Sequence, residues 1–384
     1  MALGSARTSR RQAGRTREET AAPRRTAPVS TTEDGRPTAT GWLLRGKDGR
    51  LTAYAPTDEG VLRWTETRPA GPEWTGPELI VESAGLDPHL AIAQGADGYV
   101  HLFAIRRTEG DDGQVRTEIV MAVQYQSGRP VRDWHSLGTP YAQDWVHAAQ
   151  IGRPTAVVDA KGNAHVFIRN AGGGVCVRSQ IPSGLFSKWA DLKGSAAQGL
   201  LAAGVAESGR IEILAPTAKS IMRWVQDDGD KPKFNREADI PSQVINGSVA
   251  AVRTGEDRLT FYWRDDKSGE VYAWRPDSAP EPLGGATGTG PVALLRAAVD
   301  GHDCTLMAHR DGDGRPALAA YPTENESVGA VWTGTGEVCV GAPALALDAH
   351  GRVVLAAFAP DGSLRITRQK TNEPGLAMEA WTSV

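Results

Sequence analysis

The sequence predicts an all-β protein, a seven-bladed β-propeller of four-stranded blades with a disordered N-terminal tail. Two observations carry this prediction. The 384 residues include 44 Gly and 24 Pro, well above average usage, and this excess of turn formers disfavours a mainly helical chain. From about residue 40 onward, one pattern of apolar runs, tight polar turns and a Trp recurs with a period of about 48 residues, which is typical of propeller repeats.

The first 38 residues form a separate, basic segment. They contain eight Arg and four acidic residues, which leaves the tail at about +4 and the remainder of the chain at about −8. The segment has no apolar periodicity, so residues 1–38 are predicted to be a disordered tail. No apolar stretch follows Arg10 and Arg11, so a secretory signal is not expected. A cytoplasmic protein, or one released without a signal peptide, is therefore predicted. The tail is interpreted as a solvated linker, as an electrostatic tether to a protein partner or a membrane surface, or as an export address that does not use the general pathway.

Seven repeat units account for residues 39–384. Successive first turns lie 46 to 49 residues apart, except for one gap of 64 residues in the second unit. There, Arg106–Gln114 is predicted to lengthen a hairpin loop. The anchoring turn residues are Gly49, Gly98, Gly162, Gly209, Asp257, Asp303 and Gly351.

Each unit contains three clear strands and a short fourth one. The apolar runs are short and separated by Asp-Gly, Lys-Gly or Ser-Gly turns, which supply the positive φ that tight hairpins need. The first strands, such as 291–295 and 342–347, are small and apolar, as expected where seven strands converge on the inner wall of a propeller. Two modes of ring closure stay open: residues 30–40 joining the last blade, or a last blade built from the seventh unit alone.

Four short motifs carry a family resemblance. They are Asp348–Arg352, Asp361–Leu364, Trp134–Gly138 and Trp189–Gly194. This pattern resembles the propeller lectins of the Photorhabdus-type and tachylectin/tectonin-like group. The resemblance implies sugar binding in clefts between adjacent blades, with a glycan or glycoconjugate as partner. Two to four working sites are expected, acting together because individual sites of this kind are weak.

Eight of the eleven Trp fall in two phased classes. Five end the units, and three lie in third strands. One interpretation is that these rings are wedges between neighbouring blades, since each buries a large apolar area. The other is that they stack on sugar rings beside polar neighbours. The predicted ligand-binding residues are Trp64 with Arg63, Trp224 with Arg223, Trp274, Trp74, Trp134 and Trp189.

The sequence contains no established catalytic or metal-binding motif. His302, Cys304 and His309 do not have zinc-ligand spacing, and alternation along a strand places Cys304 and His309 on opposite faces. No cofactor, metal site or catalytic residue is predicted. The acidic balance disfavours nucleic acid, and no apolar segment is long enough to span a membrane. The alternative functions are a protein-interaction scaffold and an enzyme with its site at the channel mouth, where Asp159, Asp300 and Asp348 are candidates.

Overall fold

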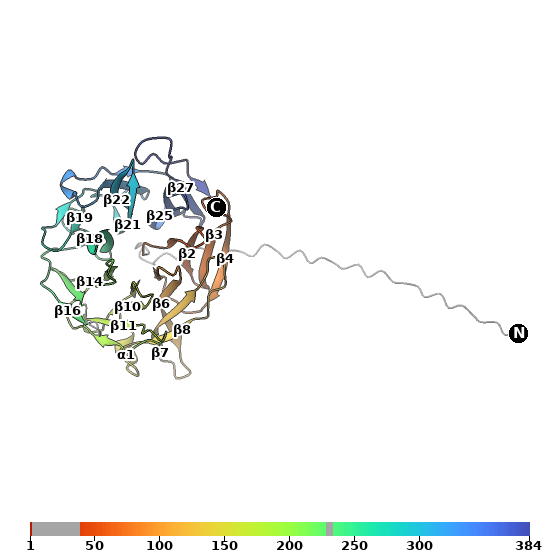
Figure 1. Ribbon diagram of the computed structural model, residues 1–384. Coiled ribbons are helices and arrows are strands. Elements are labelled where there is room, and N and C mark those ends of the chain that lie inside the picture. The colour runs from red at the N-terminus through yellow and green to blue at the C-terminus, as the bar shows by residue number, and fades with distance from the viewer. Residues whose placement is uncertain (2–38, 228–232) are drawn as a thin grey trace.

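The computed structural model describes Met1, residues 39–227 and residues 233–384. In these ranges, seven sheets of four antiparallel strands are arranged around one axis, which confirms the predicted seven-bladed propeller (Figure 1). The predicted tail, residues 1–38, lies outside the described part of the chain apart from Met1. No helix in the described ranges is long and apolar enough to cross a membrane.

The four strands of each blade follow one another in the chain. The first three blades comprise β1 (Leu43–Arg45), β2 (Leu51–Thr57), β3 (Gly60–Glu66), β4 (Trp74–Glu82); β5 (Ala91–Gln94), β6 (Val100–Glu109), β7 (Val115–Gln124), β8 (His135–Gly138); and β9 (Thr155–Val158), β10 (Ala164–Arg169), β11 (Val175–Ser179), β12 (Ala190–Asp191). The fourth and fifth comprise β13 (Ala202–Val205), β14 (Ile211–Pro216), β15 (Ile221–Gln226), β16 (Phe234–Arg236); and β17 (Ala250–Gly255), β18 (Arg258–Arg264), β19 (Val271–Trp274), β20 (Glu281–Pro282). The last two comprise β21 (Thr289–Val299), β22 (His302–Arg310), β23 (Pro316–Pro322), β24 (Thr333–Gly334); and β25 (Val340–Leu347), β26 (Val353–Phe358), β27 (Leu364–Arg368), β28 (Thr382–Ser383). The described part of the chain also contains two short helices, α1 (Trp145–Ala148) and the 3-10 helix η1 (Glu326–Val328).

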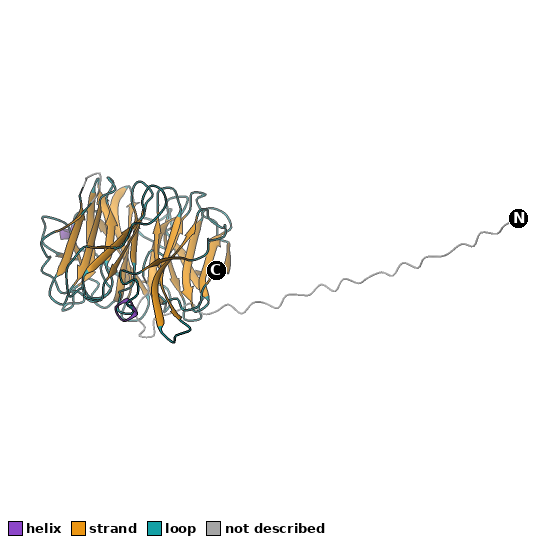
Figure 2. Ribbon diagram, turned by 90° about the horizontal axis from the view of Figure 1, so that it is seen from below, coloured by secondary structure: helices purple, strands orange, loops and turns teal. Residues whose placement is uncertain are grey.

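The strands run across the thickness of the ring, with turns on its two faces (Figure 2). The turn between β9 and β10 illustrates why they form. Gly162 has φ +82° and donates its N–H to the Asp159 carbonyl at 3.0 Å, a conformation that favours glycine. The Asp159 carboxylate accepts the Lys161 N–H at 2.9 Å. The polar dipeptides predicted as turns therefore close the hairpins through their own hydrogen bonds.

The hydrophobic core is divided into seven clusters, each between two neighbouring blades. Strand β10 shows how the alternating sequence creates this arrangement. Val166 and Ile168 pack toward the second blade, whereas Phe167 packs toward the fourth. Both faces of a blade are buried in this way, which explains why the buried stretches of the second and third strands, such as residues 102–105 and 119–123, are apolar.

The extra length of the second unit is divided between two places. Strands β6 and β7 have ten residues each, so the hairpin predicted at Arg106–Gln114 is indeed long. The connection from β8 to β9, residues 139–154, is also extended and contains α1. Placing the whole insertion in the hairpin was therefore wrong. The second part of it helps to build a cleft described below.

One polar contact recurs at the end of the third strand. In the third, fourth and seventh blades, a Gln side chain accepts the backbone N–H of the first residue in the second strand, at 3.2 to 3.3 Å. These residues are Gln180, Gln226 and Gln369. In the first blade the same place is taken by Glu66, which accepts the Leu51 N–H at 2.8 Å. A carboxylate here introduces a buried charge that an amide does not.

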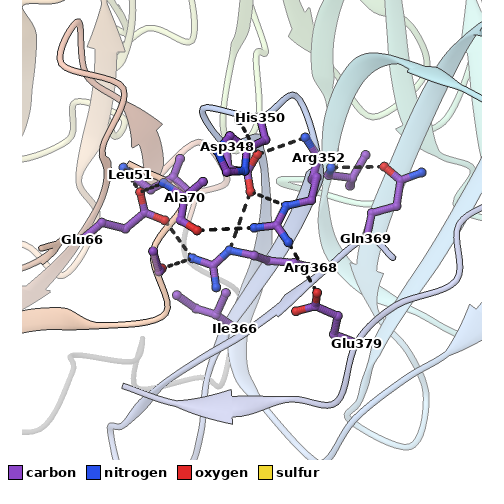
Figure 3. Close-up of polar contacts among 12 residues, drawn as sticks. Leu51, Glu66, Ala70, Asp348, His350, Arg352, Ile366, Arg368, Gln369 and Glu379 are labelled. Carbon is purple, nitrogen blue, oxygen red and sulfur yellow. Dashed lines mark hydrogen bonds and ion pairs between the residues drawn. The ribbon is translucent and has the colours of Figure 1, made fainter. Parts of the chain in front are cut away.

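Among the described residues, β25–β28 alone build the seventh blade, so the ring closes there without strand exchange. We call the contact between the seventh and first blades the seam. Glu66 is completely buried there and pairs with Arg368 of the seventh blade at 2.7 Å (Figure 3). The same guanidinium donates to the Gly71 carbonyl at 2.9 Å. The buried charge of the first blade is thus balanced by a cation about 300 positions away in the chain.

A second buried carboxylate extends the seam. Asp348 is fully buried and pairs with Arg352 at 2.8 Å, and Arg368 lies 3.8 Å from the same carboxylate oxygen (Figure 3). Its carbonyl accepts the Arg45 guanidinium of the first blade at 2.8 Å. Beside this network, Trp42 donates its indole N–H to the Ala342 carbonyl at 3.0 Å. Within the described residues, closure is by the seventh unit alone, while residues 30–38 of the other mode lie outside the described part of the chain.

Candidate functional site

The two classes of Trp differ in exposure. The third-strand residues Trp64, Trp224 and Trp274 are 1%, 0% and 9% exposed. The unit-ending residues, Trp74, Trp134, Trp189, Trp332 and Trp381, are each half-buried. Since stacking on a sugar requires an accessible ring face, the third-strand Trp do not offer one in this structure.

The predicted Arg–Trp pairs of the rim are engaged in internal contacts. Arg63 has a nearly buried side chain, pairs with Glu78 at 2.6 Å and donates to the Arg129 carbonyl of the second blade at 2.7 Å. Arg223 pairs with buried Glu212 at 2.7 Å, and its guanidinium lies 5.5 Å from the centre of the Trp274 ring. These residues hold adjacent strands and blades together. We therefore leave them, with Trp64, Trp224 and Trp274, out of the proposed site.

The unit-ending aromatics contact the preceding blade. Trp189 donates its indole N–H to the Leu137 carbonyl at 3.1 Å, and Trp332 donates to the Leu283 carbonyl at 2.9 Å. Trp74 and Trp134 also pack against interblade clusters, but their buried indole N–H groups find no acceptor within the described residues. Phe234 takes the corresponding place in the fourth blade. The wedge interpretation therefore describes this class, while one edge of each ring stays accessible.

One of these rings opens into a cleft at the outer rim between the second and third blades. We call this space, of about 800 Å³, the rim cleft. Its walls come from β7 and β8, from the 139–145 segment and from the outer part of the third blade. Its aromatic residues are Tyr141, Trp145 and Trp189.

The aromatic wall is held in place by local contacts. Trp145 begins helix α1, which is capped by Asp144 through its carboxylate and the His147 N–H at 3.1 Å. Tyr141 stacks on His147 with ring centres 5.5 Å apart, and its hydroxyl accepts the Ala171 N–H at 3.0 Å. Three rings positioned around one cleft provide flat apolar surfaces of the kind on which a sugar ring can stack.

Charged groups line the remainder of the rim cleft. Arg178 donates to the Ser187 carbonyl at 2.7 Å and to the Leu137 carbonyl. Burial lowers the pKa of Arg178. Arg116 places its guanidinium 5.8 Å from the centre of the Trp145 ring. Glu118 accepts Arg106 at 2.9 Å and the Ser136 hydroxyl. The cleft therefore combines stacking surfaces with donors for hydroxyl or acidic groups.

Sequence reasoning found Trp189 but missed Trp145. Trp145 fits neither phased class, because it lies in the connection between two units. The signal that was available is the 64-residue gap, since an insertion between repeats often carries function. The repeat phase singles out regularly spaced Trp residues, so it gives no signal for a ring that lies in the insertion.

A second cleft, of about 840 Å³, lies between the same two blades and is lined by their turns. We call it the turn-face cleft. Exposed Tyr99 and Tyr125 meet edge to face there, with ring centres 4.8 Å apart, and Arg132 lies 4.9 Å from the Tyr125 ring centre. His101 lines this cleft with both ring nitrogens buried and without a partner in the described chain. Burial lowers the pKa of His101, which favours the neutral imidazole.

Small apolar residues make up most of the lining of the central channel, with Thr40, His89 and Thr155 among them. The first strands contribute Ala, Val, Ile and Leu side chains to a space of about 290 Å³, as predicted for the inner wall. His89 lines it and donates to the Pro154 carbonyl at 3.0 Å. Burial, with the nearby Arg153 charge, lowers its pKa to about 4.

The acidic candidates for the channel mouth are engaged elsewhere. Asp159 accepts His165 at 3.2 Å, Asp300 accepts the Gly375 N–H at 2.7 Å, and Asp348 belongs to the seam. Burial alone would raise the pKa of Asp159, but its bonds to His165 and Asn163 lower it to about 2. Among the described residues, no three acidic, His or Cys side chains are grouped as they would be around a metal ion.

Comparisons with known proteins give a fold but no family. No protein-family profile and no curated protein sequence matches the chain. Among solved structures, the BP39L lectin from Burkholderia pseudomallei superposes with a TM-score of 0.67, at 15% identity, over 88% of this chain and 96% of that one. The chain shares its fold with a lectin.

Two carbohydrate-active enzymes are also structural neighbours. An ulvan lyase of a polysaccharide lyase family matches with a TM-score of 0.56, at 10% identity, over 92% of this chain and 96% of the other. The Hadza microbial sialidase Hz136 matches with a TM-score of 0.50, at 14% identity, over 70% and 62%. Such distant likenesses show the fold alone. Membership of the Photorhabdus-type or tachylectin/tectonin-like group stays a prediction.

Proposed function

We propose that this propeller binds carbohydrate in the rim cleft between its second and third blades. The observation that carries the proposal is the grouping of Trp145, Trp189 and Tyr141 around one open space with Arg116 and Arg178. An apolar sugar face stacks on an aromatic ring, while guanidinium groups donate to the hydroxyls. The lectin among the structural neighbours supports this choice.

The resemblance implies two to four working sites, and we propose a second one beside the rim cleft. The turn-face cleft, with Tyr99 and Tyr125, is the second one. Binding at both clefts of one blade interface would raise the avidity for a branched or polymeric glycan, provided that one chain spans both. Recruitment of a protein partner by the basic tail is a separate proposal, which deletion of residues 2–38 tests.

The test is a glycan array probed with the full chain, followed by titration of the hits against two variants. Trp145→Ala removes a ring of the rim cleft, and we expect a loss of affinity of about fivefold or more. Trp381→Phe changes a unit-ending Trp between the sixth and seventh blades and serves as the matched control, with affinity within twofold of the parent.

Two results would contradict the proposal: no glycan binding, or equal binding by the parent and Trp145→Ala. The same incubations should be analysed for shortened or unsaturated products. Such products would favour the alternative that this protein cleaves carbohydrate, as the names of the two other structural neighbours indicate for those enzymes.

A further inference from the structure

The rim cleft is basic although the protein around it is acidic. Outside the first 38 residues, the chain has about eight more acidic than basic residues. Three cationic side chains nevertheless line this one cleft, Arg116, Arg178 and Lys188. A concentration of one sign of charge against the overall balance indicates that the site attracts the opposite charge.

The acidic side chain of the cleft, Glu118, does not neutralise these cations. Both of its oxygens are engaged, one by Arg106 at 2.9 Å and the other by the Ser136 hydroxyl. Its charge is therefore already compensated by a guanidinium outside the set of three. The net charge contributed by the cleft residues together with Arg106 stays positive.

The three cationic side chains are hardly paired with carboxylates. Within the described residues, no carboxylate lies within 4.0 Å of Arg178 or Lys188. Arg178 donates from Nε and Nη1 to two backbone carbonyls of the described chain, which leaves Nη2 free to donate and leaves the charge uncompensated. Arg116 approaches Asp112 only at 3.9 Å, with both side chains about half exposed. Such a pair contributes little, so the Arg116 charge remains available to a ligand.

We propose that the rim cleft selects an anionic saccharide, one whose ring carries a carboxylate or a sulfate ester. This inference rests on the proposed carbohydrate function. The sugar ring stacks on Trp145 or Trp189, and its acidic group receives charge-assisted hydrogen bonds from Arg116, Arg178 and Lys188. Guanidinium groups suit this role because they present paired donors to planar or tetrahedral oxyanions.

The turn-face cleft provides an internal comparison. Its lining contains two cations, Arg132 and Lys161, and two carboxylates, Asp97 and Asp133. The same two blades thus form one basic cleft and one with balanced charge. A preference for acidic sugars is therefore a property of the rim cleft and not of the blade interface as a whole.

The first experiment compares matched sugars. Titrations of the full chain use a glucuronate-containing hexasaccharide against its carboxyl-reduced form, and a sulfated hexasaccharide against its desulfated form. We expect the acidic member of at least one pair to bind tenfold more tightly, with an affinity that falls as NaCl rises from 50 to 500 mM. Whether carboxylate, sulfate or both are accepted identifies the oxyanion.

Variants locate the effect. Arg116→Gln and Lys188→Gln change half-exposed or exposed side chains, so the fold should be retained, and each should weaken acidic-sugar binding about threefold to tenfold while neutral-sugar binding is unchanged. Arg253→Gln in the fifth blade and Lys219→Gln in the fourth are matched controls, expected to stay within 1.5-fold of the parent.

The outcomes separate the two proposals. Equal affinity for acidic and neutral members overturns the anionic preference and leaves sugar binding in place. An equal loss in the control variants also overturns it, since the effect would then be diffuse attraction. No binding of any saccharide overturns both the preference and the proposed function.

Discussion

The seam and the interface between the second and third blades use charged side chains in opposite ways. At the seam, Glu66 and Asp348 are fully buried and paired with arginines of the seventh blade. At the rim of the other interface, Arg116 and Arg178 line an open cleft without a close acidic partner in the described chain. The first arrangement closes a contact, whereas the second leaves charge available for a ligand.

The path of the chain explains the difference. Residues 139–154 join the second blade to the third, so these two blades stay together even where their outer edges are parted. Within the described residues, no segment joins the seventh blade to the first, so the contacts described between these two blades are non-covalent. A joined interface can therefore carry a cleft, while the seam is held by buried packing and by the pairing of Glu66 and Asp348 with arginines.

The largest expected effect comes from breaking the seam. Arg368→Ala leaves Glu66 as an unpaired buried carboxylate, which we expect to lower the free energy of unfolding by about 3–5 kcal/mol. Chemical denaturation at pH 7 measures it. Glu66→Gln with Arg368→Leu should recover most of the loss, because the amide then matches Gln180, Gln226 and Gln369 in their blades. A loss in Arg368→Ala no larger than in the exposed Arg253→Ala would contradict this account of the seam.

Acid should weaken the second–third interface through His89. In the folded chain its pKa is lowered to about 4, chiefly by burial. Because the unfolded chain takes up this proton near pH 6.5, the stabilisation is complete above that pH and declines as the pH falls toward 4. The loss is about 3 kcal/mol at most.

Unfolding measured at pH 7, 5.5 and 4.5 tests this prediction. His89→Gln retains an N–H donor for the Pro154 carbonyl and does not titrate, so its stability should depend less on pH over this range. Exposed His302→Gln is the control and should follow the parent. Parallel curves for His89→Gln and the parent would show that His89 does not contribute to the loss in acid.

The smallest expected effect is the loss of sugar affinity in Trp145→Ala, and a comparison with Trp64→Ala distinguishes a role in ligand binding from a role in packing. Trp145→Ala should cost about 1 kcal/mol of sugar affinity, roughly fivefold, with little change in the unfolding midpoint. Trp64→Ala should do the reverse, because Trp64 is 1% exposed and packs at the seam beside Phe358. Calorimetry measures the unfolding midpoint of both variants, and titration measures their sugar affinity. A similar loss of affinity in folded Trp64→Ala would mean that the seam contributes to the site.

Repetition made the fold predictable. The spacing of polar turns fixed the number of blades, and the alternation in runs such as β10 followed from strands that are buried on both faces. The residues at the ends of the third strands, Glu66, Gln180, Gln226 and Gln369, can also be found in the sequence. Their role depends on a hydrogen bond from the backbone N–H of the second strand in the same blade, which the repeat pattern does not reveal.

The site was harder to predict because it departs from the repeat. Phased Trp such as Trp64 and Trp224 are where packing requires them, so their regular spacing indicated burial and not exposure. Trp145 lies in an insertion, and Arg116 and Arg178 come from different blades. No single-sequence pattern connects such residues, since the closed ring brings them together.

The continuity of each blade has a consequence for how the chain can be rearranged. Between the sixth and seventh blades, residues 335–339 lead the chain from an outer strand, β24, to the next inner strand, β25. A linker from β28 to β1 would make the same step, so the termini could be joined there and opened elsewhere without dividing any blade. In such a circular permutant, the buried pair of Glu66 and Arg368 would lie between two blades that the chain connects. The break in the chain would then lie between two other adjacent blades, whose contact in the parent protein is supported by a covalent connection.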